Sequence, residues 1–182
     1  MAGLIPRALV LTAALTLAAD SGFAQDKPDF SGSWILTSGP SDGDVPQAVS
    51  IRQLLRRTNV RGEPMTPFFS DITITRTLAT GTSSETFPIG VEGGSISGAV
   101  VGDRTPGTTP RTVTRTHWRV DWEDKTLVLE SVSYTGPAPE TGDWSERREM
   151  ISLTPNGDLR LEMTSRSSTS DRRTSVATYR RQ

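Results

Sequence analysis

The chain contains no cysteine, one histidine and few aromatic residues, and these shortages exclude several classes of site. Without cysteine there are no disulfide bonds, no thiolate metal ligands and no cysteine nucleophile. Because His117 is the only histidine, a metal site built from several histidines cannot form. A chain of 182 residues without disulfides must therefore take its stability from one hydrophobic core.

Neither sign of charge is in excess. Lys and Arg total 20, Asp and Glu total 21, and the net charge is −1 at pH 7. A near-neutral chain has no overall attraction for polyanions, so we expect no nucleic-acid partner. The one local excess is the basic segment with Arg52, Arg56, Arg57 and Arg61, which suits either a solvated face or contact with an anionic ligand or partner.

Only one apolar run is long, and it lies near the N-terminus. Residues 8–19 are almost entirely apolar, but the run is shorter than the roughly 20 residues that a membrane-spanning helix needs. Gly22 and Ala24 provide small residues at positions −3 and −1 of a cleavage site. We therefore predict a cleaved export signal over residues 1–24, and a periplasmic or secreted single domain over 25–182 with no stable membrane insertion. An uncleaved anchor or a buried N-terminal helix is the alternative.

The rest of the chain alternates apolar and polar residues between turn signals, the pattern of antiparallel strands. Residues 71–78 and 111–122 show this alternation, and the glycine-rich residues 90–94 predict a turn. Asn156-Gly157 predicts a tight hairpin turn, because glycine accepts a positive φ. We predict an all-β fold, an antiparallel meander of about eight or nine strands closed into a lipocalin-like up-and-down barrel. An open curved sheet or a sandwich is the alternative.

Residues 39–70 depart from this pattern, and we expect a long irregular or partly helical insertion there. Within residues 47–57, Val49, Leu54 and Leu55 partly fit a helical stripe, and two arginines follow near the end of the segment. The competing assignment for the same segment is an edge strand from Val49 to Leu55.

Four short motifs carry a family resemblance. Phe30-Ser-Gly32-Ser-Trp34 resembles the Gly-x-Trp element that opens lipocalin and fatty-acid-binding barrels. With the turn and strand of residues 122–129, the hairpin of 153–159 and a final Tyr179-Arg180-Arg181, the chain is similar to a group of small exported bacterial proteins of unknown function. The resemblance covers about residues 29–181 and implies a barrel without implying an activity.

The resemblance to lipocalin-like barrels also implies how the barrel closes. In such barrels a late arginine lies over the tryptophan of the first strand, and a glycine beside the indole leaves room. We therefore expect the first and last strands to pair, with Gly32, Trp34 and Arg180 forming the closure, and with Arg181 as the alternative arginine.

No pattern in the sequence predicts catalysis. His117 has no readable serine or aspartate partners, and Asp121, Glu123 and Asp124 lack the spacing of a calcium loop. The glutamates that flank Arg147-Arg148 suggest cross-strand ion pairs rather than an acid–base pair. We predict no catalytic residues, no metal site and no cofactor.

The apolar residues of the strands suggest either core packing or a ligand pocket. A small hydrophobic ligand inside the barrel would be lined by Trp118, Val120, Trp122, Leu127, Leu129, Leu161 and Met163. The expected function is thus an exported, non-enzymatic β-barrel domain that binds a small apolar ligand in its interior. The alternatives are a structural or protein-interaction domain with a filled core and, as a minor one, a lipocalin-like isomerase or cyclase with titratable groups facing inward.

Overall fold

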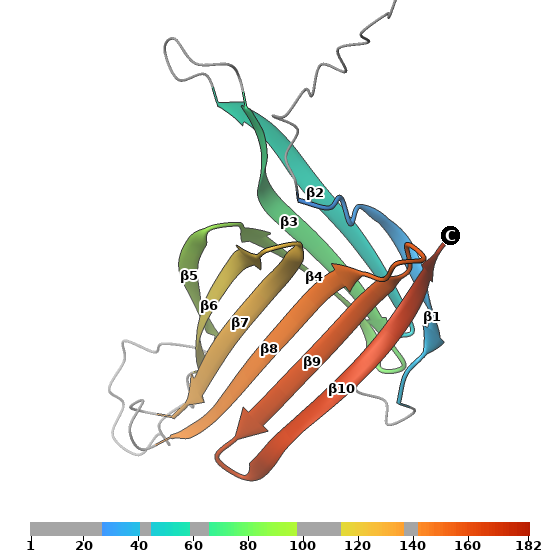
Figure 1. Ribbon diagram of the computed structural model, residues 1–182. Helices are drawn as coiled ribbons and strands as arrows, with labels where there is room; N and C mark the ends of the chain where they lie inside the picture. The colour runs from blue at the N-terminus through green and yellow to red at the C-terminus, as the bar shows by residue number, and fades with distance from the viewer. Residues whose placement is uncertain (1–26, 41–44, 59–65, 98–113, 137–141) are drawn as a thin grey trace, which may run out of the picture.

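The computed structural model describes residues 27–40, 45–58, 66–97, 114–136 and 142–182. Within these ranges the chain forms ten strands and no helix, so no helix of the described residues is long and apolar enough to cross a membrane. The all-β prediction is confirmed (Figure 1). The strands are β1 (Gly32–Ser38), β2 (Ala48–Thr58), β3 (Thr66–Leu78), β4 (Gly81–Pro88), β5 (Val91–Ser97), β6 (Thr114–Glu123), β7 (Thr126–Thr135), β8 (Asp143–Leu153), β9 (Leu159–Ser167) and β10 (Ser170–Arg181).

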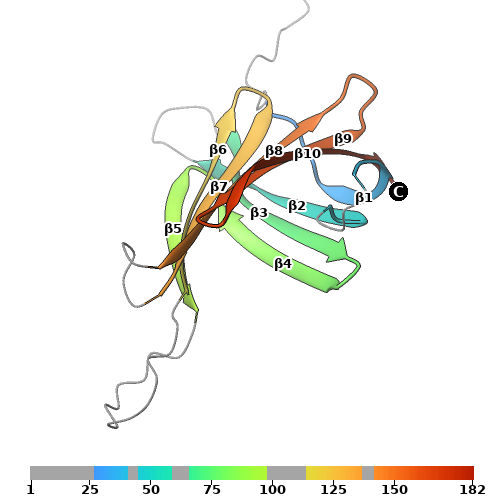
Figure 2. The same ribbon diagram turned by 90° about the horizontal axis from the view of Figure 1, so that it is seen from below.

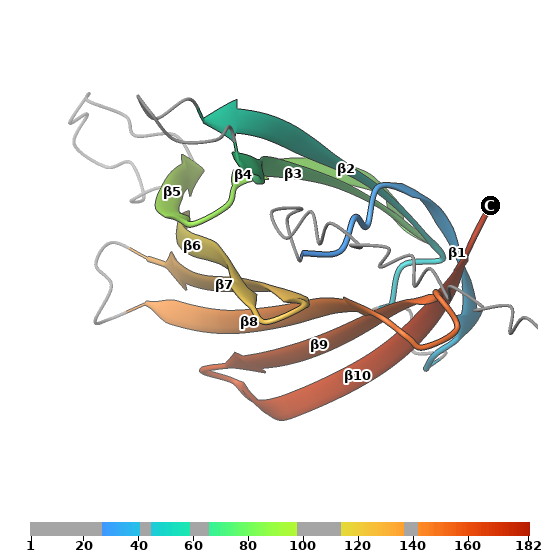
Figure 3. The ribbon, with the colours of Figure 1, turned by 45° about the horizontal axis from the view of Figure 1, so that its top comes forward.

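All ten strands belong to one antiparallel sheet in the order β4-β3-β2-β1-β10-β9-β8-β7-β6-β5. Each strand pairs with its neighbour in sequence except at one point, because β4 and β5 lie at opposite ends of this order. The last strand returns to pair with the first. Figures 2 and 3 show β1 and β5 on opposite sides, between a layer of β2–β4 and a layer of β6–β10. The meander is therefore a nearly closed barrel, open between β4 and β5.

The helix expected over residues 47–57 is wrong, and the segment is a strand, as the competing assignment had it. It is not an edge strand, however, because β2 lies between β1 and β3. Val49 and Ile51 alternate inward and are buried, with Val49 opposite Trp34 and Ile51 opposite Ile74. This period of two belongs to a strand, and burial between two neighbours outweighs the partial helical spacing. The described part of residues 39–70 is thus mostly β2 and the start of β3, and β2 is the strand that brings the count to ten.

The arginine that closes the barrel is Arg181, which corrects the expected Arg180. The register of β1 against β10 places Arg181 directly opposite Trp34. The Arg181 guanidinium carbon lies 4.7 Å from the centroid of the indole. Alternation turns Arg180 to the outside, where 75% of its side chain is exposed. Gly32 lies beside the stacked arginine, since a Cβ at Gly32 would be 3.4 Å from Arg181 Nε.

Two further predictions concern residues that the structure does not describe. The export signal over residues 1–24 lies outside the described ranges, and so does Arg61 of the basic segment. The other three arginines of that segment lie on β2.

One end of the barrel is filled by packed side chains. Its core includes Phe30, Trp34, Ile72, Leu127 and Tyr179, each almost entirely buried. The polar tips of the two largest have partners. Trp34 Nε1 donates to the Phe30 carbonyl at 2.9 Å, and the Tyr179 hydroxyl donates to the Pro46 carbonyl at 3.0 Å. The hydroxyl and indole groups are therefore buried without loss of hydrogen bonding.

Candidate functional site

The inward side chains of β6–β9 change from apolar to polar along the strands. The register aligns them in rows across the four strands, and consecutive rows are two residues apart. The rows are Trp122, Leu127, Ile151 and Leu161; then Val120, Leu129, Glu149 and Met163; then Trp118, Ser131, Arg147 and Ser165; and then Thr116, Ser133, Ser145 and Ser167. The barrel interior thus has a packed apolar end and a hydroxyl-rich end, with charged residues between them.

A pocket of about 530 Å³ lies in the polar part of the barrel interior. Its lining includes residues of both β4 and β5, so the pocket lies at the opening of the barrel. Four of the lining residues are apolar, and the others carry hydroxyl or charged groups. The lining residues are Arg76, Glu85, Thr86, Phe87, Ser95, Thr116, Trp118, Val120, Leu129, Glu130, Ser131, Ser133, Ser145, Arg147 and Glu149.

The structure separates the seven residues that were expected to line a ligand. Trp118, Val120 and Leu129 line the pocket. Leu127, Leu161 and Met163 belong to the packed core. Trp122 lies at the filled end, where its ring stacks on Phe30 with 5.7 Å between centroids.

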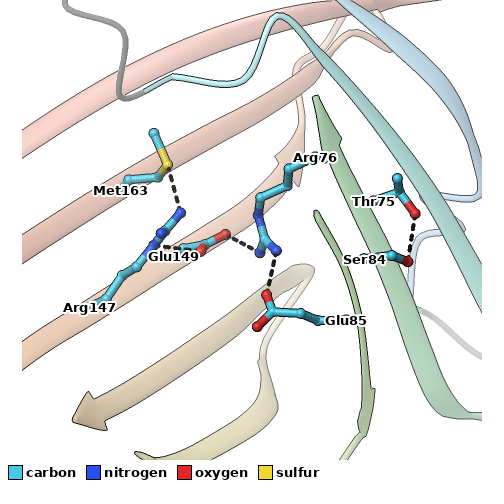
Figure 4. Close-up of polar contacts among 7 residues, drawn as sticks. All are labelled: Thr75, Arg76, Ser84, Glu85, Arg147, Glu149 and Met163. Atoms are coloured by element: carbon cyan, nitrogen blue, oxygen red, sulfur yellow. Dashed lines mark hydrogen bonds and ion pairs between the residues drawn. The ribbon is translucent and has the colours of Figure 1, made fainter. Parts of the chain in front are cut away.

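A chain of four alternating charges crosses the barrel interior beside the pocket (Figure 4). Arg76 Nη1 lies 3.0 Å from Glu85, Arg76 Nη2 lies 2.7 Å from Glu149, and Arg147 Nε lies 2.7 Å from the other oxygen of Glu149. The inner two side chains are only 6% and 7% exposed, whereas Glu85 and Arg147 are 57% and 46% exposed. The chain therefore has a buried centre and two ends in contact with solvent.

Strand alternation explains why these charges point inward. Arg76 follows Ile72 and Ile74 at intervals of two on β3, and Glu149 precedes the buried Ile151 by two on β8. A charge on the inner face must be paired, since an unpaired buried charge is costly. The cross-strand ion pairs expected around Arg147-Arg148 are present in part. Arg148 contacts Glu130 of the neighbouring strand, whereas Glu149 binds Arg147 of its own strand.

The charge chain also affects the tyrosine behind it. Burial raises the pKa of the Tyr179 hydroxyl, the negative charge of Glu149 raises it further, and Arg76 acts in the opposite direction. Tyr179 consequently stays protonated and keeps its hydrogen bond to Pro46. Arg76 Nε is itself buried and has no hydrogen-bond partner among the described residues.

An aromatic contact spans the opening between β4 and β5. The indole of Trp118 extends from β6 across Gly93 of β5, where an added Cβ would lie 2.1 Å from the ring. On the far side the indole meets Phe87 of β4 edge to face, with 5.4 Å between centroids. This close approach therefore requires glycine at position 93. Gly93 and Gly94, which the sequence places in a predicted turn, lie inside strand β5.

The remaining titratable candidates do not join this site. His117 is exposed on the outer face of β6, opposite in direction to Trp118. Among the described residues, no group of three or more His, Cys, Asp or Glu is placed to hold a metal ion.

Comparison of the sequence with protein-family models and with curated protein sequences gives no match. The function must therefore be argued from the pocket and its chemistry.

Proposed function

We propose that the chain is a non-enzymatic binding module that holds a small, neutral ligand with both an apolar ring face and hydrogen-bonding groups. The observation that carries this proposal is the pocket of about 530 Å³ at the opening of the barrel. Its volume falls within the range of small-molecule sites, roughly 300–1,000 Å³. Trp118 and Phe87 supply the apolar wall against which a flat group packs.

The polar groups of the pocket determine the chemistry of the ligand. The hydroxyls of Ser131 and Ser145 have no hydrogen-bond partner among the described residues. A purely apolar ligand would remove these hydroxyls from water without compensation, which is unfavourable. A ligand with its own donors and acceptors satisfies them. The apolar ligand expected from the sequence is therefore replaced here by an amphiphilic one.

The charges of the pocket favour a neutral ligand. Arg76 and Arg147 are matched by Glu85 and Glu149, and each charge already has an opposite partner within 3.0 Å. The four charges sum to zero, so an ionised ligand would meet no net opposite charge in this chain of ion pairs.

Inward carboxylates are also what an isomerase or cyclase on this barrel would need. Glu149 favours that second candidate because it lies in the pocket wall. Both of its oxygens, however, are already paired with arginines, at 2.7 Å each, so neither is free to contact a ligand. Conversion of the ligand, rather than its retention, would distinguish the enzyme from the binding module.

Native mass spectrometry of the protein isolated from its own host tests the binding proposal. We expect one small molecule of reproducible mass per chain. Ser131→Phe fills the pocket and should abolish the adduct. Ser152→Phe places the same bulk on the outer face of β8, away from the barrel interior, and this variant should retain the adduct. Absence of any adduct would instead support a structural or interaction domain without a ligand. An adduct that survives Ser131→Phe would place the ligand outside this pocket.

We also propose that the protein is exported and cleaved after Ala24. The support is the sequence of residues 1–24, an apolar run followed by small residues at the cleavage positions. N-terminal sequencing of the protein from its host should begin at Gln25. Protein that retains Met1 would rule out cleavage.

A further inference from the structure

The β2–β3 hairpin extends beyond the strands that flank it. β1 pairs with β2 only from Ala48 to Ile51, and β4 pairs with β3 only from Asp71 onward. Residues 54–58 and 66–69, here called the hairpin extension, pair only within the β2–β3 hairpin in the described structure. Residues 55–58 pair with 66–69, and Leu54 pairs with Asp71. Figure 1 shows the ends of β2 and β3 projecting from the barrel. The extension thus has no neighbouring strand along either of its edges.

Large apolar side chains are concentrated on this extension. Leu54, Leu55 and Phe68 are 49%, 50% and 39% exposed, and they are three of the seven exposed large apolar residues in the described ranges. The register shifts between Leu54 and Leu55, whose partners are Asp71 and Phe69, so Ser70 of β3 is the extra residue of a bulge. Leu55 pairs with Phe69, whose ring faces Trp122 of the barrel, whereas Phe68 points to the other side. Apolar groups therefore lie on both faces of a two-stranded ribbon.

The same strand carries a local positive charge. Arg52, Arg56 and Arg57 are exposed on β2, and β2 contains no acidic residue. Asp71 pairs with Arg56 at 3.4 Å, which leaves the other two arginines in excess. Because the whole chain has a net charge of −1, this attraction for anions is confined to the hairpin.

We propose that the hairpin extension docks peripherally on a lipid bilayer that contains anionic lipid. Leu54, Leu55 and Phe68 enter the interface, and the arginines contact lipid phosphates. A flat protein partner would cover one face of the ribbon and leave the apolar groups of the other face in water. The interface of a bilayer surrounds an inserted ribbon on both faces, and its anionic headgroups complement the arginines.

Because the chain has no cysteine, one substitution creates a single labelling site for the test. Leu55→Cys carries the environment-sensitive fluorophore NBD on the extension, and Val176→Cys carries it at an exposed apolar position on β10. We expect a saturable blue shift at position 55 with vesicles of phosphatidylcholine and phosphatidylglycerol, and none with phosphatidylcholine alone. Position 176 should not respond. Unchanged circular dichroism verifies the fold of both labelled chains.

The arginines are tested in the same assay. The triple variant Arg52→Gln/Arg56→Gln/Arg57→Gln should bind the vesicles about tenfold or more weakly. Added salt should lower the vesicle affinity of the unsubstituted chain in the same way. Arg180→Gln, which removes an exposed arginine from β10, is the matched control and should have no effect. The proposal would be overturned if the fluorophore at position 55 showed no shift, or if position 176 shifted equally. It would also be overturned if phosphatidylcholine alone gave an equal shift, or if the triple variant kept full affinity for the vesicles. Loss of the vesicle response leaves the pocket untouched, so it is distinguishable from failure of ligand binding.

Discussion

Arg181 and Trp34 join the last strand of the barrel to the first. The guanidinium carbon lies 4.7 Å from the centroid of the indole, and the indole itself is buried. Around this contact, Arg181 Nη2 donates to the Ser31 carbonyl at 3.1 Å, and the amide of Gln182 donates to the Ser33 carbonyl at 2.9 Å. The stacked pair therefore covers the end of the apolar core where the two strands meet.

Arg181→Ala should destabilise the fold by about 0.5–1 kcal/mol, because it removes a cation–π contact at a largely exposed site. Arg180→Ala is the matched control, because the Arg180 side chain is exposed and its ion pair with Asp158 is long, at 4.0 Å. We expect no measurable change in stability. Urea denaturation of the two variants measures the difference. Equal effects would contradict the register between β1 and β10.

Arg76→Met should cost about 2–3 kcal/mol of unfolding free energy, because Glu149 would remain buried with Arg147 as its only partner. The double variant Arg76→Met/Glu149→Leu should recover most of that loss, since the half-exposed Arg147 can then be hydrated. Arg160→Met, which breaks an exposed pair with Glu162, should change stability by less than about 0.5 kcal/mol. A double variant no more stable than the single one would show that the ion pair is not the source of the loss.

Gly93→Ala should displace the Trp118 indole, because the new methyl group would lie 2.1 Å from the ring. We expect a red shift of tryptophan emission as the indole loses Gly93 and Phe87 and becomes more hydrated. Gly94→Ala serves as the control on the other face of β5, where the added carbon would meet only the Thr116 carbonyl and His117. An unchanged emission spectrum in Gly93→Ala would mean that Trp118 does not cross β5.

Gly157→Val should cost about 1 kcal/mol or more, because Gly157 has a φ of 82° at the turn between β8 and β9. No atom lies within 4 Å of the position that a Cβ would occupy, so the cost arises from the backbone conformation alone. Gly157→Asn should cost less, since asparagine tolerates positive φ better than a β-branched residue. Thermal denaturation that ranks the two variants in the opposite order would contradict this explanation.

Stability should fall at alkaline pH because of Tyr179. Its pKa is raised in the folded state by burial and by Glu149, so the unfolded chain releases this proton at a lower pH than the folded chain. The stabilisation is complete below the unfolded value of about 10 and is lost as the pH rises above it. Tyr179→Phe should weaken the fold at neutral pH through loss of the bond to Pro46, yet show a smaller decline above about pH 10. Denaturation midpoints at neutral and alkaline pH measure both effects.

The sequence was sufficient for the fold class because the apolar residues alternate with a period of two in most strands. The barrel closure also followed, since an unpaired first or last strand would expose its backbone groups. The segment of Val49 to Leu55 was ambiguous because the adjacent apolar residues Leu54 and Leu55 interrupt the alternation. Without knowledge of the two neighbouring strands, that interruption resembles a helical stripe.

The pocket could not be predicted in the same way. Arg76 and Glu149 are 73 residues apart in the chain, and their pairing depends on how the sheet curls rather than on any local pattern. The choice between Arg180 and Arg181 likewise depended on the register of one strand pair, which a single residue reverses. Trp118 was identified as a pocket residue from its face of the strand, but its passage across Gly93 is a contact between side chain and backbone that alternation does not encode.

The opening between β4 and β5 gives the barrel a seam with no backbone ladder across it in the described structure. Ile89 and Gly90 join the two strands, and their amides donate to Ser70 on one side and to Val120 on the other. The aromatic contact of Phe87 with Trp118 is made across this seam. Opening this seam would separate the rings of Phe87 and Trp118, but it would break no ladder of hydrogen bonds between β4 and β5.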